Sequence, residues 1–407
     1  MKRTLITNIG MLATPQGTAA RGGRAQGEIC ILKNAWIFIE NDVIAQVGTG
    51  TAPAAADAQT INAGGKLVTP GLVDAHTHLI FGGWRQNELA LKLHGAGYLD
   101  ILAAGGGILS TMRATKAASE EQLEAKASAA LDEMLRFGTT TAEAKSGYGL
   151  STGEECKALR VIGKLQKHHV MDLAATFMGA HAVPEAYRDN RQGYLELLCE
   201  EMLPAVREQG IAEFCDVFCE KGVFSAEESR RILLTGRQYG LRPKIHADEI
   251  EAIGGSELAG EIGAVSAEHL IVCPPSGIAS MAEGGTVACC LPATSFYLGA
   301  AYAPVQDMVQ AGVPVAMATD FNPGSCPCLN MQLVISLGCL RYRLTPEQAL
   351  TAVTLNGAAA ICRDRIGSIE PGKQADILIW NAEDLDYICY RLGSNLVDTV
   401  IKKGNVV

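Results

Sequence analysis

Residues 66–79 of the chain read KLVTPGLVDAHTHL, an apolar run that ends in two histidines separated by one residue. Successive side chains of a β-strand point to opposite faces, so His76 and His78 would point the same way and Thr77 the other way. The two imidazoles would then converge on one point, where neutral imidazole can bind a divalent transition metal. Two structural histidines with ordinary hydrogen bonds at a strand end would show the same pattern. Features elsewhere in the chain are therefore needed to distinguish a metal site from a structural pair.

The size and composition of the chain favour a folded protein that acts on a small molecule. Its 407 residues suffice for a barrel of roughly 250 residues and a smaller domain. Hydrophobic residues make up 48% and charged residues 19%, which provides ample material for a buried core. The formal net charge of −10, with no Lys/Arg cluster suited to phosphates, argues against a nucleic-acid partner. We therefore expect a small-molecule substrate.

The cysteines and the start of the chain indicate a cellular compartment. The 13 cysteines are scattered, and an odd number cannot close into a complete set of disulfides. No apolar run of signal-peptide length follows Lys2 and Arg3. No apolar span of about 18 residues occurs elsewhere. We therefore expect a cytoplasmic protein with reduced thiols and no membrane association.

Between residues 65 and 360, apolar strand-like runs alternate with amphipathic helix-like runs, which indicates repeated βα units and a parallel sheet. The expected helices include 120–137, 153–169, 193–209 and 225–239. The eight expected strands are 67–79, 139–144, 173–178, 214–218, 243–247, 266–271, 286–291 and 314–319. Eight such units predict an α/β fold, a (β/α)8 barrel of the TIM type, whose active site lies at the C-terminal strand ends.

The two ends of the chain share a different pattern, in which short apolar runs are separated by turn residues. Asn41 and Asp42, for example, stand between two such runs and predict a tight hairpin turn. We expect both ends to build one small β-sandwich. The expected domains are thus a sandwich from residues 1–64 together with 361–407, and a barrel from residues 65–360.

Side chains that bind metals or move protons gather at the C-terminal ends of the expected strands. Five of the eight histidines lie at or just after such ends, as do Glu143, Lys145 and Asp320. A metal site in a hydrolase needs three or four nitrogen or oxygen ligands and one position for water. Such an ion lowers the pKa of bound water from about 15.7 towards about 7. The expected ligands are His76, His78, His246 and Asp320.

These strand ends resemble the metal site of the amidohydrolase superfamily, which joins a (β/α)8 barrel to a split β-sandwich. Within that superfamily, seven segments resemble the imidazolonepropionase family, and the resemblance covers nearly the whole chain. The segments are HLIFGGWR (78–85), AAGGGILST (103–111), KSGYGL (145–150), GAHAVP (179–184), IHADE (245–249), SAEHL (266–270) and DFNPGS (320–325).

The resemblance implies a reaction of histidine degradation. It is the hydrolytic opening of 4-imidazolone-5-propanoate to N-formimidoyl-L-glutamate, in which a metal-activated water attacks the cyclic amide carbonyl. One divalent metal ion, Zn2+ or Fe (2+ or 3+), is the implied cofactor. A homodimer is implied by analogy with this architecture.

The resemblance also implies roles for residues outside the metal site. Arg85 would clamp the propionate carboxylate of the substrate with two parallel hydrogen bonds, a geometry that Lys cannot reproduce. The Tyr148 hydroxyl could reach the same carboxylate. His181 would hydrogen-bond the ring carbonyl and stabilise the developing oxyanion. Glu249 would interact with a ring nitrogen of the substrate, either as a proton shuttle or as a hydrogen-bond acceptor that orients the ring.

Two further groups of residues complete the implied site. His269 would orient or deprotonate the attacking water, with Asp320 sharing that role, although relatives in the superfamily can use such a histidine as a metal ligand. Asn322, Gly324 and Ser325 would form a turn that grips the polar end of the substrate.

Other interpretations remain open from the sequence. A deaminase of the same superfamily, acting on a purine, pyrimidine or cyclic amidine, would release ammonia and leave Arg85 without a carboxylate to bind. A non-catalytic barrel scaffold would have no use for an intact set of metal ligands. Glu143 and Lys145 could also indicate a carbamylated lysine between two metals. Because Lys145 belongs to the KSGYGL segment of the one-metal family, we expect one metal.

Overall fold

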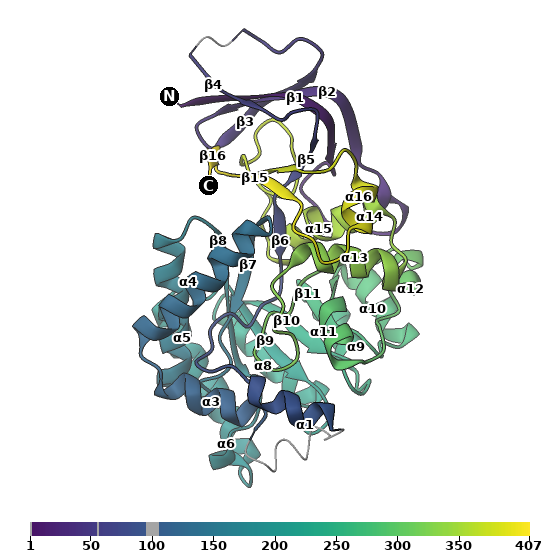
Figure 1. Cartoon of the computed structure of the whole chain (residues 1–407). Helices are drawn as coiled ribbons and strands as arrows, with labels where there is room; N and C mark the ends of the chain where they lie inside the picture. Colours follow the sequence, from purple (N-terminus) through teal and green to yellow (C-terminus); the bar gives the residue numbers. More distant parts are fainter. Residues whose placement is uncertain (1, 55–56, 95–105) are drawn as a thin grey trace.

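The computed structural model describes residues 2–54, 57–94 and 106–407 and contains two eight-stranded sheets (Figure 1). One sheet comes from the middle of the chain and the other from its two ends. Residues 103–105 of the AAGGGILST segment lie outside the described residues.

The middle of the chain forms a parallel sheet in which each strand pairs with the next one along the sequence. The fully buried pattern of these strands fits a sheet that is covered by helices. The strands are β6 (Leu72–Asp74), β7 (Thr139–Lys145), β8 (Asp172–Ala180), β9 (Phe214–Cys219), β10 (Arg242–Ala247), β11 (Ser266–His269), β12 (Val287–Cys290) and β13 (Val315–Met317).

Hydrogen bonds between the first and last units close this sheet into a barrel. The Asp320 amide donates to the His76 carbonyl at 3.0 Å, and the His78 amide donates to the Phe321 carbonyl at 2.9 Å. The buried carboxylate of Asp74 accepts from the amide and the hydroxyl of Thr319 at 3.0 and 2.6 Å. These bonds bring the segments that follow β6 and β13 together, and both segments carry expected metal ligands.

Helices connect the strands and surround the barrel (Figure 1). Ser119 and Ser225 begin two of them with capping boxes, as their sequence positions allow. Among the described residues, the α-helices after β6 are α1 (Leu89–Leu93), α3 (Ile108–Ala117), α4 (Glu120–Arg136), α5 (Thr152–His168), α6 (Arg191–Glu196), α7 (Leu203–Gln209), α8 (Ala226–Gln238), α9 (Gly255–Glu261), α10 (Pro275–Gly284), α11 (Pro292–Leu298), α12 (Val305–Gln310), α13 (Met331–Tyr342), α14 (Pro346–Ala352), α15 (Leu355–Ala360) and α16 (Leu385–Tyr390).

The helices expected at 120–137, 153–169 and 225–239 are confirmed by α4, α5 and α8. The helix expected at 193–209 is present as α6 and α7 joined by a π-helical segment, Leu197–Met202. Among the described residues, no helix is both long enough and apolar enough to cross a membrane.

The expectation of a single strand over residues 67–79 was wrong, because the chain passes from one sheet to the other at Gly71. β5 (Leu67–Pro70) pairs with β1 and β14 in the sheet of the chain ends, whereas β6 belongs to the barrel. At Gly71 a Cβ would lie 2.3 Å from the Thr140 hydroxyl oxygen, so the tight crossing requires glycine. His76 and His78 therefore follow the end of β6, and a domain boundary at residue 64 stays a prediction.

The second sheet joins the two ends of the chain, and both termini lie beside it (Figure 1). Its central strand β5 links β1 to β14, and Asn41 makes the expected turn between β2 and β3 with a φ of 56°. The fold is therefore a TIM-type barrel with a small β-sandwich. The sandwich strands are β1 (Arg3–Thr14), β2 (Cys30–Glu40), β3 (Val43–Thr49), β4 (Gln59–Asn62), β5, β14 (Ile377–Trp380), β15 (Val397–Lys402) and β16 (Asn405–Val406).

Candidate active site

Four side chains meet at the C-terminal end of the barrel, and they are the expected metal ligands. The Oδ1 atom of Asp320 lies 3.4 Å from Nε2 of His76 and 3.6 Å from Nε2 of His78. Nε2 of His246 lies 3.3 Å from Nε2 of His78. All four side chains are buried. The ligand atoms of His76, His78 and Asp320 are close enough together to hold one metal ion.

The protonation states of these groups suit a divalent metal. Burial lowers the pKa of His76 and His78 well below the ordinary value, so both imidazoles are neutral. Nε2 of His76 has no hydrogen-bond partner among the described residues. An unpartnered buried nitrogen is costly in free energy unless a ligand or water satisfies it. The donor set of imidazole nitrogens and one carboxylate oxygen therefore fits a divalent ion.

Two buried carboxylates orient two of the imidazoles. Nδ1 of His76 donates to Oε2 of Glu268 at 2.5 Å, and Nδ1 of His246 donates to Oδ1 of Asp216 at 3.1 Å. A carboxylate bound to Nδ1 fixes the proton there and leaves the lone pair on Nε2, which faces the site. Neither carboxylate was predicted from the sequence, although Asp216 is the only charged residue of the otherwise apolar strand β9.

Two buried lysines connect these carboxylates through a third. Nζ of Lys244 lies 2.9 Å from Glu143 and 3.3 Å from Glu268, and Nζ of Lys145 lies 2.8 Å from Glu143 and 2.7 Å from Asp216. All five side chains have no exposed surface. We call Glu143, Lys145, Asp216, Lys244 and Glu268 the barrel charge cluster.

The cluster explains Lys145 without a second metal. Burial favours the neutral amine, but the charges of Asp216 and Glu143 outweigh this effect and raise the pKa of Lys145 above its ordinary value. Carbamylation requires the neutral amine, which these two carboxylates disfavour. The environment of Lys145 is thus consistent with the expectation of one metal.

His269 and Asp320 both adopt left-handed backbone conformations, with φ of 69° and 57°. Such conformations are uncommon for residues other than glycine, and they aim these two side chains into the site. Oδ2 of Asp320 accepts a hydrogen bond from the Thr294 hydroxyl at 2.7 Å, which leaves Oδ1 towards the histidines. His269 lies with His76 and His246 in a second group of possible metal ligands.

Glu249 lies beside His269, where the IHADE segment was expected to place it. Its Oε2 is 3.6 Å from Nε2 of His269. Burial raises the pKa of Glu249 to about 7 and lowers the pKa of His269 to about 4. A carboxyl group that titrates near neutral pH can both accept and donate a proton during a reaction at that pH.

His181 stacks on His78, with ring centroids 4.8 Å apart, but its hydrogen bond does not suit the expected oxyanion role. Its Nδ1 lies 3.0 Å from the Gly147 carbonyl, which can only accept, so the proton is on Nδ1. Burial lowers the pKa of His181 to about 3, so the ring is neutral and Nε2 is an acceptor. Donation to an oxyanion would need the disfavoured imidazolium.

Arg85 and Tyr148 lie on the loops that follow β6 and β7. Tyr148 is buried beside His181, with ring centroids 5.2 Å apart. Arg85 forms a bidentate pair with Glu88, from Nε at 3.0 Å and from NH2 at 2.8 Å. The guanidinium of Arg85 also packs on Gly324, where a Cβ would lie 2.1 Å from NH1. Gly324 thus leaves room for Arg85.

The expected turn after β13 is present. The Asn322 side-chain oxygen accepts from the amides of Gly324 and Ser325 at 2.8 and 2.7 Å. Its nitrogen donates to the Ser325 hydroxyl at 2.8 Å. These bonds hold the turn beside Asp320 and Arg85, so the structure brings all of the expected site residues to one end of the barrel.

Comparison with known proteins identifies the family. A model of the amidohydrolase family matches residues 67–407. An imidazolonepropionase of Alkaliphilus metalliredigens is 50% identical over an alignment that covers 100% of this chain and 98% of the relative. The chain belongs to the imidazolonepropionase family. A second imidazolonepropionase, of Alkaliphilus oremlandii, is 51% identical and covers 99% of this chain and 97% of its own length.

Solved structures support the fold. A triazine hydrolase variant has a TM-score of 0.75 at 18% identity, over 100% of this chain and 94% of its own. An adenosine deaminase of Xanthomonas campestris with bound zinc has a TM-score of 0.71 at 21% identity, over 99% of this chain and 92% of its own. At such identities these likenesses concern the architecture that imidazolonepropionases share with other amidohydrolases.

Two further buried glutamates hold loops of the candidate site, and neither was predicted from the sequence. Glu155 accepts from the amides of Gly147, Gly149 and Leu150 at 3.0, 2.8 and 2.7 Å, which fixes the turn that carries Tyr148. Glu220 accepts from the amide of residue 250 at 2.9 Å, directly after Glu249. Their sequence positions, on a helix and after a strand, gave no sign of these roles.

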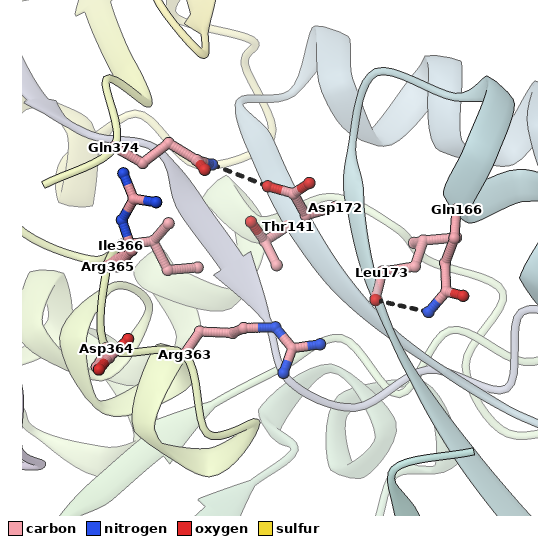
Figure 2. A pocket seen from close by; sticks show the side chains of 9 residues that line it. All are labelled: Thr141, Gln166, Asp172, Leu173, Arg363, Asp364, Arg365, Ile366 and Gln374. Carbon is pink, nitrogen blue, oxygen red and sulfur yellow. Dashed lines mark hydrogen bonds between the residues drawn. The ribbon is translucent and has the colours of Figure 1, made fainter. Parts of the chain in front are cut away.

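A separate cavity of about 380 Å³ lies at the N-terminal ends of β7 and β8 (Figure 2). Asp172, the first residue of β8, lines it and accepts from the Gln374 side chain at 2.8 Å. Arg363 lines it as well and pairs with Glu213. The cavity is therefore at the end of the barrel opposite to the histidines, and it is distinct from the imidazolonepropionase site.

Proposed function

We propose that this chain hydrolyses 4-imidazolone-5-propanoate to N-formimidoyl-L-glutamate in histidine degradation. The observation that carries this conclusion is the identity of about 50% with imidazolonepropionases over the full chain. The site adds independent support, because it combines neutral imidazoles that suit a metal with a largely buried arginine that suits a carboxylate. The metal would activate the water that opens the ring, and the arginine would bind the propionate group.

We propose that His76, His78, His246 and Asp320 hold the divalent ion, which is zinc or iron. When bound, the ion supplies a Lewis acid that makes hydroxide available from water near neutral pH. Glu268 and Asp216 keep the Nε2 lone pairs of His76 and His246 directed at the ion. Thr294 does the same for one oxygen of Asp320.

The remaining residues bind the substrate and move protons. Arg85 and Tyr148 bind the propionate carboxylate, and the turn formed by Asn322, Gly324 and Ser325 contacts the polar end of the substrate. A neutral His181 with its proton on Nδ1 is suited to accept a hydrogen bond from a ring N–H. The oxyanion role expected from the sequence, which needs a proton on Nε2, stays a prediction.

Proton transfer involves His269 and Glu249, which lie side by side. His269 is neutral at pH 7 and can accept a proton from the attacking water, with Asp320 sharing the role. Glu249 titrates near pH 7 and can shuttle a proton to the departing ring nitrogen. A homodimer and a cytoplasmic location stay predictions.

The test is turnover of freshly generated 4-imidazolone-5-propanoate by the zinc-loaded protein. Loss of the ring chromophore, gain of one water in the product mass and no ammonia are expected. Release of ammonia would instead support a deaminase, and no turnover of this substrate by the metal-loaded protein would refute the proposal. Asp320→Asn, which alters an expected metal ligand, is the negative control.

A further inference from the structure

The guanidinium of Arg85 is held by a carboxylate of the chain itself. Glu88 accepts from Nε and NH2 of Arg85, and the pair is almost entirely buried, with exposed side-chain fractions of 13% for Arg85 and 2% for Glu88. A guanidinium has five N–H donors in a rigid plane. Glu88 occupies the edge of the guanidinium formed by Nε and NH2. The edge formed by NH1 and NH2 is therefore the one that can donate two hydrogen bonds to a substrate carboxylate.

Glu88 is itself fixed by the chain on its far side. The Gly107 amide donates to Oε1 of Glu88 at 2.7 Å. Gly107 immediately precedes α3 and has a φ of 70°, a conformation that favours glycine. Glu88 therefore connects the loop after β6 to the start of α3. Because Glu88 is held in this way, its two hydrogen bonds fix the plane of the Arg85 guanidinium.

A second contact fixes the position of the same guanidinium from the opposite side of the site. Gly324 packs against NH1 of Arg85 so closely that a Cβ would lie 2.1 Å away. Rotation of the guanidinium about its long axis would move NH1 into this backbone or away from it. Two independent segments therefore define one orientation of the guanidinium, with Glu88 as its polar anchor.

We propose that Glu88 is a positioning residue that orients Arg85 and thereby sets the preference of the site for a ligand with a terminal carboxylate. The inference rests on the proposed function, in which Arg85 binds that carboxylate. Glu88 acts through Arg85 and does not touch the substrate. Binding of a carboxylate needs the planar fork of arginine in register with both oxygens, and a freely rotating guanidinium loses that register.

The negative charge of Glu88 has an effect on carboxylate binding that opposes its positioning effect. The negative charge of Glu88 offsets the positive charge of Arg85, so a purely electrostatic view predicts tighter binding of a carboxylate when Glu88 is neutralised. The positioning view predicts weaker binding, and a larger loss for alanine than for glutamine, because the glutamine oxygen can still accept one of the two hydrogen bonds. The two views therefore differ in sign.

The experiment compares the zinc-loaded protein with its Glu88→Gln, Glu88→Ala and Arg85→Met variants. The probes are imidazole-4-propionate and imidazole-4-propionamide, which share the ring and differ only in the carboxylate. Calorimetric titration gives the dissociation constants, and their ratio is the preference for the acid. Glu213→Gln is the matched control, since Glu213 also forms a bidentate pair with an arginine, here with NH1 and NH2 of Arg363 at 2.7 and 2.6 Å, at the other end of the barrel.

We expect wild type and Glu213→Gln to prefer the acid and Arg85→Met to lose the preference. Glu88→Ala should lower it by roughly tenfold, as about 1.4 kcal/mol of lost binding would, with a smaller loss for Glu88→Gln. With the natural substrate, KM should rise while kcat stays within about twofold, which a general loss of folding would not produce.

Three outcomes separate the inference from the proposed function. If wild type shows no preference for the acid, the carboxylate role of Arg85 is wrong. If wild type prefers the acid and both Glu88 variants retain or increase that preference, the positioning role of Glu88 is overturned while the proposed function stands. Zinc content and the unfolding midpoint show whether Glu88→Ala folds. If it does not, the ratio of dissociation constants for Glu88→Gln tests the positioning role of Glu88 alone.

Discussion

Replacing Lys244 with methionine tests whether the barrel charge cluster stabilises the fold. Nζ of Lys244 lies 2.9 Å from Glu143 and 3.3 Å from Glu268, and it also donates to the Ala75 carbonyl at 3.1 Å. Methionine has nearly the same length and no charge. The substitution therefore removes the ammonium group and leaves the packing of the stem largely unchanged.

The charges of the cluster give the expected magnitude. Its three carboxylates and two lysines sum to a formal charge of −1, with all five side chains fully buried. Without Lys244 the sum becomes −2, and Glu268 loses its lysine partner. Removing one partner of a buried ion pair costs about 3–5 kcal/mol, because the remaining charge is left uncompensated. We expect Lys244→Met to lower the free energy of unfolding by that amount.

Urea unfolding of the metal-free protein, followed by circular dichroism, measures the effect. Lys66→Met is the matched control, since Lys66 pairs with Asp398 at 2.9 Å on the surface with about a third of each side chain exposed; such pairs contribute about 0–1 kcal/mol. Adding Glu143→Gln to Lys244→Met should recover part of the loss, because it removes the excess charge. A Lys244→Met variant no less stable than Lys66→Met would refute the reasoning.

Three further predictions concern catalysis and pH. His269→Ala should lower kcat by about 10²–10⁴ while zinc content, measured by atomic absorption, stays near wild type; loss of zinc would make His269 a ligand. Since burial raises the pKa of Glu249 to about 7, kcat/KM should rise as the pH passes about 7 and its carboxylate forms, and Glu249→Gln should abolish this limb; an unchanged profile would exclude the role. Although burial opposes the effect, Lys402 lowers the pKa of Asp172 from 3.8 to about 2. Its carboxylate therefore adds about 2 kcal/mol of stability above pH 4 that is lost as the pH falls towards 2; unfolding of Asp172→Asn should show this difference at pH 7, and an equal deficit at pH 2 would contradict it.

The barrel and its histidines could be predicted because apolar strand-like runs, amphipathic helix-like runs and the residues at strand ends are local properties of a sequence. Seven of the expected strands coincide with β7 to β13 to within a few residues. The residues expected at the site then met because parallel strands deliver their C-terminal ends to one edge. Lys145 was visible in the same way, although its partner Asp216 on the next strand but one was not recognised.

The parts that the sequence did not reveal depend on contacts between distant segments. The change of sheet at Gly71 follows from the close approach of Thr140, which no local pattern encodes. Glu88 stands on a single short turn of helix and Glu155 near the start of α5, positions where a surface glutamate would be equally natural. The proton position on His181 follows from the Gly147 carbonyl, 34 residues away.

The uninterrupted passage from β5 to β6 has a consequence for how this enzyme can be divided. β5 is a central strand of the sandwich, and His76 follows it by only six residues, from Pro70. The sandwich therefore anchors the segment that carries His76 and His78, two of the proposed metal ligands. A truncated chain that lacks the sandwich strands would keep most of the proposed site residues. It would lose the strand β5 that holds the segment of His76 and His78 in place. We therefore expect that replacing the sandwich with an unrelated domain would displace His76 and His78 from the site.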